Sequence, residues 1–318
     1  MRSTVRPSRL ATLAAFAAAG TLVLAGVTPA SAFQHVTFVS VSGDDGNNCG
    51  SPQEACFSLQ AAYDQSVDGG QINIIDGGHY AGIVISKSIT INGEAAKDAV
   101  IHNGFSIETE EGEEVMLRGL VVETACCAAI NYRGSGSLQV EGCVIDGTRS
   151  GLQGVVLFPT GEGRVSIADT VVRNFAFPGS AGLLLEAEKP DPIRLSLERV
   201  SLVGNDIGMR IVAQRGDGVK AVVRDSIVAQ NGVNSINGGN GIEVSGLAFS
   251  DVLIERTAVV GNGLIGVHSE GNATVRLRTA TVTHNGTGID PKGILSYGDN
   301  VIDANGTNGT PTEVGTLK

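Results

Sequence analysis

The chain has 318 residues, of which 44 are glycine, and its formal net charge is −11 at pH 7. So acidic a protein is not expected to bind nucleic acid, because that binding depends on Lys and Arg side chains that neutralise phosphates. The same charge predicts repulsion of anionic polysaccharides unless a divalent cation bridges the two. The many glycines favour a fold made largely of tight turns.

Residues 1–32 have the pattern of a secretory signal peptide. They contain a basic start with three arginines, an Ala- and Leu-rich run over 10–27, and an Ala-Ser-Ala cleavage site at 30–32. Cleavage removes three arginines and no acids, so the formal charge changes from −11 to −14. No other stretch is long and apolar enough to cross a bilayer. We expect a secreted, periplasmic or cell-surface protein without a membrane span; an uncleaved anchor is the alternative, which the cleavage pattern disfavours.

Residues 33–70 are predicted to form an N-terminal cap. A strand is expected at 36–42 and a short helix at 57–64, where it would cover the core and strand edges at the end of a solenoid. Cys49 and Cys56 bracket a Gly- and Asn-containing loop, which in an exported protein predicts a disulfide. A zinc site is the competing interpretation, but no His or further Cys lies nearby in sequence.

Short strands are expected next, and a nine-residue pattern then occurs seven times. The strands are expected at 71–75, 82–86, 88–92 and 99–102. The copies of the pattern are 115–123, 138–146, 165–173, 195–203, 221–229, 252–260 and 275–283. Their spacings are 23, 27, 30, 26, 31 and 23 residues, and the first, third and eighth positions are apolar in every copy.

These apolar columns predict a parallel β-helix. The first and third positions share one face of a strand, because side chains alternate with a period of two. Repeats this short are typical of solenoids, and Val-, Ile- and Leu-rich strands without a helical stripe favour one coil per repeat. Coils stacked about 4.8 Å apart would share one core. A leucine-rich repeat is the competing fold, but the copies lack its Leu-x-x-Leu-x-Leu spacing.

Asparagine follows the eighth position by three residues in four coils, at Asn205, Asn231, Asn262 and Asn285. Asn tolerates the left-handed turn conformation, and stacked Asn side chains can hydrogen-bond from coil to coil. We therefore expect an asparagine ladder. The longer middle spacings add loop residues, which either shape a binding surface or reflect drift in loop length.

Three further cysteines lie among the coils. Cys143 occupies a column of small and apolar residues and is predicted to be a small core residue. Cys126 and Cys127 have three open fates: free thiols, a vicinal disulfide, or a bridge from one of them to Cys143. The β-helix is expected to span 33–310, with a flexible tail at 311–318.

The order of segments over 36–120 resembles a known group. A strand is followed by a Cys-to-Cys loop ending ACFSLQAAY, then by GGQINIIDGGHYAG, ISKSITINGE and VMLRGLVV. This order resembles the bacterial secreted β-helix repeat proteins of the pectin-lyase-like superfamily, and GILSYGDNVIDANGTNG resembles their closing coil. The resemblance implies an all-β fold, a single-stranded right-handed parallel β-helix solenoid with a short N-terminal capping helix. It implies no activity, because lyases, polygalacturonases, epimerases and phage tailspikes share this architecture.

The ninth position supplies the candidate catalytic residues, Glu123, Asp146 and Arg173. Because the eighth position is buried, the ninth should face outward, with the three residues on successive coils about 4.8 Å apart. Two carboxylates this close raise each other's proton affinity, as in acid–base pairs. The competing interpretation is a solvated ladder in which Arg173 compensates Asp146.

Other signals of chemistry are weak. Charges at the fourth and fifth positions mostly alternate in sign from coil to coil, which assigns them to folding. The polygalacturonase motifs and the calcium carboxylates of a lyase are missing. The five histidines are scattered, with no pair at metal-ligand spacing, so no metal or cofactor is expected. The absence of Trp argues against an aromatic sugar-binding platform.

We therefore expect a non-catalytic exported protein that presents a rigid surface to an extracellular or cell-wall polysaccharide. One alternative is a polysaccharide lyase or glycoside hydrolase that uses the ninth-position residues or the middle loops. Another is a structural or adhesive surface protein. The sequence leaves the oligomeric state and any calcium requirement open.

Overall fold

The computed structural model describes residues 33–148, 150–188, 192–216, 218–233, 235, 238–290 and 292–314. The predicted signal peptide, residues 1–32, lies outside the described residues. Within them, no helix has the length and apolar character needed to cross a membrane.

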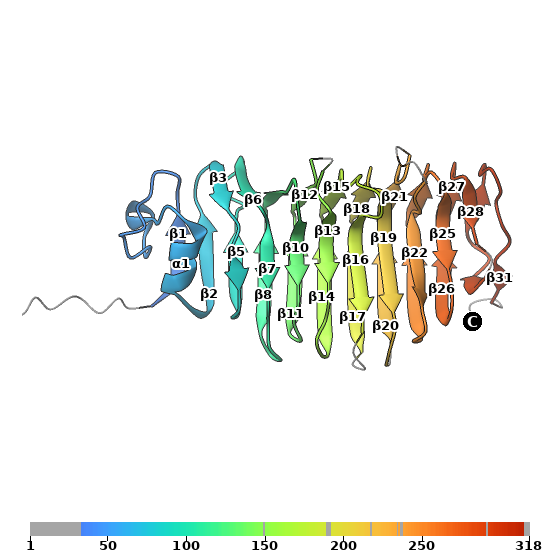
Figure 1. Cartoon of the computed structure of the whole chain (residues 1–318), viewed down its shortest axis with the longest axis horizontal. Helices are drawn as coiled ribbons and strands as arrows, with labels where there is room; N and C mark the ends of the chain where they lie inside the picture. Colours follow the sequence, from blue (N-terminus) through green and yellow to red (C-terminus); the bar gives the residue numbers. More distant parts are fainter. Residues whose placement is uncertain are drawn as a thin grey trace, which may run out of the picture. The chain divides into compact units, whose positions relative to one another are not determined.

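Residues 34–313 contribute strands to three sheets of a right-handed parallel β-helix (Figure 1). Sheet A contains β1 (Gln34–Val39), β2 (Ser66–Ile74), β5 (Ile89–Asn92), β8 (Glu114–Arg118), β11 (Ser137–Glu141), β14 (Gly163–Ala168), β17 (Ile193–Glu198), β20 (Val219–Arg224), β23 (Ser250–Glu255), β26 (Ala273–Arg278), β29 (Ile294–Ser296) and β31 (Thr312–Glu313). Sheet B contains β3 (Gly78–Ala81), β6 (Ala99–His102), β9 (Val121–Glu123), β12 (Val144–Asp146), β15 (Val171–Arg173), β18 (Ser201–Val203), β21 (Ile227–Ala229), β24 (Ala258–Val260), β27 (Thr281–Thr283) and β30 (Val301–Asp303). Sheet C contains β4 (Val84–Ile85), β7 (Phe105–Ile107), β10 (Ala128–Tyr132), β13 (Gln153–Leu157), β16 (Ala181–Ala187), β19 (Ile207–Ala213), β22 (Ile242–Gly246), β25 (Ile265–Ser269) and β28 (Thr287–Ile289).

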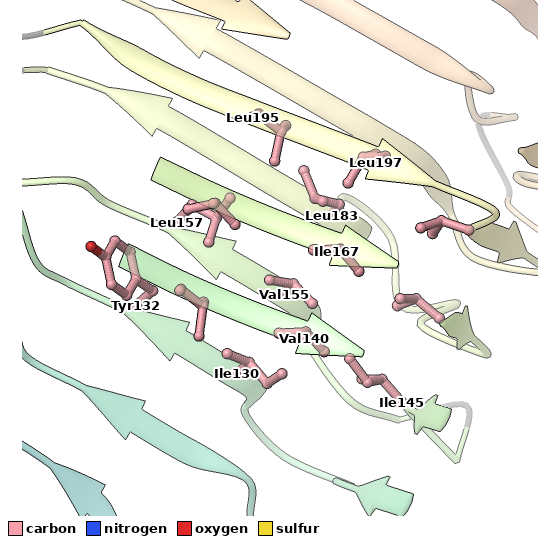
Figure 2. Close-up of a cluster of buried hydrophobic side chains, with 14 of the residues drawn as sticks. Ile130, Tyr132, Val140, Ile145, Val155, Leu157, Ile167, Leu183, Leu195 and Leu197 are labelled. Atoms are coloured by element: carbon pink, nitrogen blue, oxygen red, sulfur yellow. The ribbon is translucent and has the colours of Figure 1, made fainter. Parts of the chain in front are cut away.

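The core is made of the three predicted apolar columns. The first and third positions come from sheet A and the eighth from sheet B, and all of them are buried. Figure 2 shows these side chains meeting residues of sheet C in the space between the sheets. Each buried Val, Leu or Ile stabilises the fold by about 1.5–3 kcal/mol relative to an exposed one, so the repeated columns account for the stacking of the coils.

The turn from sheet A to sheet B depends on the fifth position of each repeat. Its backbone is left-handed throughout, with φ +61° at Gly119 and +52° at Arg199. At Gly119 a Cβ atom would also lie 2.9 Å from the backbone nitrogen of Glu94. The fifth position is therefore a bend as well as a site of charge, and every residue there except glycine bears backbone strain.

The asparagine ladder is confirmed at the turn from sheet B to sheet C. The Asn231 Nδ2 donates to Asn262 Oδ1 at 2.9 Å and to the Leu202 carbonyl at 3.1 Å, and the other members bond alike. The expected left-handed conformation of these asparagines is wrong. It occurs one residue earlier, with φ +68° at Gly204 and +55° at Gln230. The buried asparagines instead satisfy backbone groups of the neighbouring coils.

The N-terminal cap holds the helix α1 (Leu59–Gln65) and the short 3₁₀ helix η1 (Pro52–Glu54). The Ser58 Oγ accepts a hydrogen bond from the Ala61 N–H at 3.1 Å, so α1 begins two residues after the predicted start. The Lys87 ammonium lies over the Tyr63 ring and donates to the carbonyl of Tyr63 at 2.8 Å. These contacts hold α1 against the first coils.

Disulfides join Cys49 to Cys56 and Cys126 to Cys127. Burial raises the pKa of the free Cys143 thiol to about 11, which suits the small core residue that the sequence predicts.

At the C-terminal end, β31 pairs with β29, so ordered structure continues into the predicted tail. Residues 315–318 lie outside the described residues. Of the extra residues of the middle coils, 174–180 connect sheet B to sheet C.

Candidate functional site

The three ninth-position residues are adjacent on sheet B. Glu123 pairs with Asp146, and Asp146 with Arg173, in the strand register. The expectation that this position faces outward is wrong for Asp146, whose side chain is 12% exposed. Figure 1 places β12 and β15 on neighbouring coils, one after the other along the stack.

Hydrogen bonds surround the Asp146 carboxylate. Its Oδ2 lies 2.7 Å from the Arg173 Nε, and its Oδ1 accepts from the Asn174 amide at 3.0 Å and the Thr148 N–H at 2.9 Å. Burial raises the pKa of Asp146, but these donors together outweigh burial and hold the pKa below its usual value. A carboxylate that stays ionised with its oxygens occupied is a poor proton donor. This environment favours the ladder interpretation over an acid–base pair.

A groove follows the outer face of sheet A. Its largest part has a volume of about 610 Å³ and is lined by outward side chains of β14, β17, β20, β23 and β26. A second part of about 470 Å³ shares Arg164 and Arg194 with the first, and a third of about 320 Å³ shares Glu114 and Gln139 with the second. The three parts make one path across the successive coils, which we call the sheet A groove.

Three cations stack in the middle of the sheet A groove. Arg164 pairs in register with Arg194, and Arg194 with Lys220, so like charges lie on adjacent strands about 4.8 Å apart. All three side chains are exposed, and within the described part of the chain none has a side-chain hydrogen bond or ion pair. We call these residues the cation ladder. Like charges directly opposite one another destabilise a sheet, so folding does not account for them.

The groove is electrically uneven along its length. At the end nearer the N-terminus, carboxylates line it: Glu111, Glu113, Glu114 and Glu162. At the other end Asp251, the next residue in register after Lys220, is already paired with Arg276. The cation ladder is therefore a positive segment on an acidic protein, and the net charge does not describe this face.

Apolar side chains line much of the largest part of the groove, beside the cations. Val222 and Leu253 contribute aliphatic surface between the charges, and Tyr297 supplies an aromatic ring to the lining. One ring and two aliphatic side chains fit recognition that depends on charge more than on stacking.

The structure also brings together two histidines that the sequence analysis treated as scattered. The Nδ1 of His79 on β3 lies 2.7 Å from the Nε2 of His102 on β6, and the ring centroids are 4.9 Å apart, so the two rings meet end to end through these nitrogens. In the strand register His79 is the partner of Val100 and His102 is the partner of Ala81, so the two histidines meet diagonally and the spacing of the repeats does not reveal the pair. His268 lies near Asp290, with 3.1 Å between Nδ1 and Oδ2.

The cation ladder was missed in the sequence although its pattern is visible there. Its members occupy the position just before the first apolar column, where three successive coils carry Arg, Arg and Lys. An alignment of the repeats does not show which charged side chains form ion pairs with residues of neighbouring turns. Only the structure shows that these three cations form none among the described residues.

Comparison with known proteins shows what the chain is similar to. No family model matches it, and no curated protein matches it in sequence. Among solved structures it is similar to pectate lyase Pel9A, with a TM-score of 0.65 and 19% identity over 90% of this chain and 79% of that one. It is also similar to a rhamnogalacturonan lyase, with a TM-score of 0.61 and 13% identity over 78% of this chain and 74% of that one. At such identities the likeness shows the fold.

Proposed function

From the premise that this chain has the pectin-lyase-like right-handed parallel β-helix fold, we propose that it is an exported protein that binds an extended acidic polysaccharide along the sheet A groove. The observation that carries the proposal is the cation ladder, three neighbouring cations without partners in the described residues. At the fourth and fifth positions of the repeats most charges have a counter-charge on the next coil, whereas Asp251, the carboxylate next in register to the cation ladder, is paired with Arg276. The groove therefore needs an external anion.

The spacing of the ladder fits a polymer better than a single small anion. The strand repeat sets the cations about 4.8 Å apart along the stack, so they form a line rather than a cluster. A polysaccharide with an acidic group on successive sugars presents a matching line of charge. The guanidinium groups of Arg164 and Arg194 can each take a carboxylate in a two-pronged hydrogen bond.

The rigidity of the fold adds to this argument. Cations held on adjacent strands need little ordering when a ligand arrives, and a preorganised site loses less entropy on binding. The structural neighbours are by name lyases of pectate and of rhamnogalacturonan, which supports a polysaccharide as the ligand.

Cleavage of the bound polymer is a second candidate. Lyases need a base to remove a proton from the sugar, and Lys220 is the amine of the cation ladder, the side-chain type that serves as a general base in enzymes. The proposal of binding without cleavage rests on Asp146, whose environment favours a structural role. Both functions use the same groove, so one experiment separates them.

The experiment compares two triple variants on a panel of acidic and neutral polysaccharides, with and without calcium. The first replaces Arg164, Arg194 and Lys220 with glutamine. The matched control replaces three paired arginines: Arg199 and Arg224 on the coils of Arg194 and Lys220, and Arg256 on the next coil. Co-sedimentation and calorimetry report binding, and new reducing ends report cleavage.

We expect the wild type and the control to bind an acidic polymer without cleaving it. The cation-ladder variant should bind at least about tenfold more weakly, since three exposed ion pairs contribute up to about 1 kcal/mol each. Equal losses in both variants would show that overall charge, not the sheet A groove, attracts the polymer. New reducing ends that depend on Lys220 would replace the binding proposal with the lyase.

A further inference from the structure

His79 and His102 lie on the outer face of sheet B, away from the sheet A groove. His79 is exposed and His102 is partly exposed, so both rings can be reached from solvent. The 2.7 Å contact between Nδ1 and Nε2 uses the N–H of one ring and the lone pair of the other. A change of tautomer in one neutral ring would point two lone pairs into the same space.

The distance between these two nitrogens is close to that between two nitrogen ligands on one metal ion. Imidazole nitrogens at about 2.0–2.1 Å from an ion are roughly 2.9 Å apart at a right angle and roughly 3.3 Å apart at a tetrahedral angle. To admit an ion, the two nitrogens would have to separate by roughly 0.2–0.6 Å from their present 2.7 Å contact, and each ring would have to turn so that its lone pair points at the ion and not at the other ring. Exposed rings on neighbouring strands can make that adjustment by side-chain rotation.

The next coil offers an oxygen ligand. Glu123 is the register partner of His102 and shares its outward side of sheet B. Within the part of the chain that the structure describes, no three His, Cys, Asp or Glu side chains are arranged to hold a metal as they stand. Glu123 must therefore turn towards the imidazoles. Asp146, one coil further, is held by Arg173 and cannot compete for the position.

We propose that His79 and His102 form a binding site for a divalent transition-metal ion, with Glu123 as the third ligand. Two imidazoles and a carboxylate suit Zn²⁺ and Cu²⁺, whereas Ca²⁺ and Mg²⁺ prefer all-oxygen sites. Open positions on the ion would be filled by water, because the site faces solvent. The bound ion would link the first three coils of sheet B, β3, β6 and β9.

The test uses the chain from residue 33, purified without a histidine tag, with Cu²⁺ or Zn²⁺ as the sole added probe. Calorimetry gives the affinity, and the thermal unfolding midpoint gives an independent readout of binding to the folded state. The variants are His79→Ala, His102→Ala, His102→Gln and Glu123→Gln. His284→Ala is the matched control, since His284 is a surface histidine that contacts the Thr283 hydroxyl.

We expect one ion per chain for the wild type and for His284→Ala, with Ca²⁺ giving no signal. Either histidine variant should weaken binding by more than the roughly 10–100-fold that changes around a metal ligand typically cost. The His102→Gln variant keeps an amide that can hydrogen-bond to His79, so its loss of metal binding would separate ligation from hydrogen bonding. Wild-type affinity in His79→Ala and His102→Ala would overturn the site, and wild-type affinity in Glu123→Gln would overturn the third ligand.

Discussion

The cation ladder and the paired charges at the bend between sheets A and B show two uses of the same stacking. At the bend, Arg199 binds Asp169 with 2.6 Å between Nε and Oδ1, and Arg256 binds Asp225 at 2.8 Å. The Arg199 guanidinium lowers the pKa of the Asp169 carboxyl. In the cation ladder, the same coils place like charges together without partners in the described residues.

The difference shows how to separate folding from function in a repeat protein. A column of charges that contains its own counter-charges penalises slips in register and needs no ligand. A run of like charges within a column raises the free energy of the folded state until an external anion neutralises it. We call a column closed when its polar groups are partners of one another, and open when they have no partner in the described residues. Closed columns belong to the fold, and an open column marks a binding surface.

The largest expected effect concerns the closed, uncharged column of asparagines. Asn231→Ala removes an amide that accepts from the Asn205 N–H and donates to Asn262 and to the Leu202 carbonyl. We expect a loss of about 3 kcal/mol in unfolding free energy, because several buried groups lose their partners. Urea unfolding measures the change, and Asn272→Ala at an exposed asparagine is the control. Equal effects of the two variants would contradict the structural role of the ladder.

The second-largest effect is expected at Asp146, whose largely buried carboxylate is paired with Arg173. Asp146→Asn is expected to cost about 1–3 kcal/mol at neutral pH, because donors around the carboxylate lose a charged acceptor. The folded-state pKa lies below the ordinary 3.8, so this stability is present above pH 3.8 and is lost as the pH falls through the folded-state pKa. Urea unfolding of both proteins across the acid range checks the sign. If the difference in unfolding free energy between the wild type and Asp146→Asn grew as the pH fell, the predicted sign would be wrong.

Removal of one charge should raise the unfolding free energy in the open column and lower it in a closed column. Arg194→Gln relieves repulsion with Arg164 and Lys220, so we expect a small rise in unfolding free energy that shrinks as salt is added. Arg199→Gln breaks the ion pair with Asp169 and should lower the unfolding free energy. Unfolding midpoints at low and high salt measure both. A loss of stability in Arg194→Gln would mean that its charge is already compensated.

The smallest effect is expected where charge and backbone strain oppose each other. Arg256 has φ +45°, so glycine there relieves strain while it removes an exposed ion pair. Arg256→Gly should be at least as stable as Arg256→Ala, which loses the pair without relief. Thermal unfolding of the two variants makes the comparison. A less stable glycine variant would show that the bend is not strained.

Much of the fold could be predicted from the sequence because its signal is repeated. Columns such as the one that runs through Val115, Leu138 and Val165 are apolar in every coil, and a strand buries alternate residues whatever its neighbours are. The expected strands and the capping helix were correct to within a few residues at their ends. Conformations of single residues were harder, as the left-handed position before Asn205 shows, because a turn can place its strain on either of two neighbours.

The candidate site could be predicted in part. The sequence placed Glu123, Asp146 and Arg173 on successive coils, and the register agrees. It did not show that Asp146 turns inward, because the direction of a side chain at a strand end depends on the following turn. His79 and His102 lie on successive coils but two positions out of register, and only the directions of their side chains bring them into contact.

By itself, the sequence determined the stacking of coils, the buried columns and the asparagine ladder, because each follows from a pattern repeated along the chain. The tertiary structure alone decided which charges are neutralised and which histidines meet. Those outcomes depend on distances across turns of unequal length, and on the direction in which each side chain leaves its strand. Charges interact over a few ångströms in space, and a separation of 23 to 31 residues in the chain does not say which side chains come within that reach.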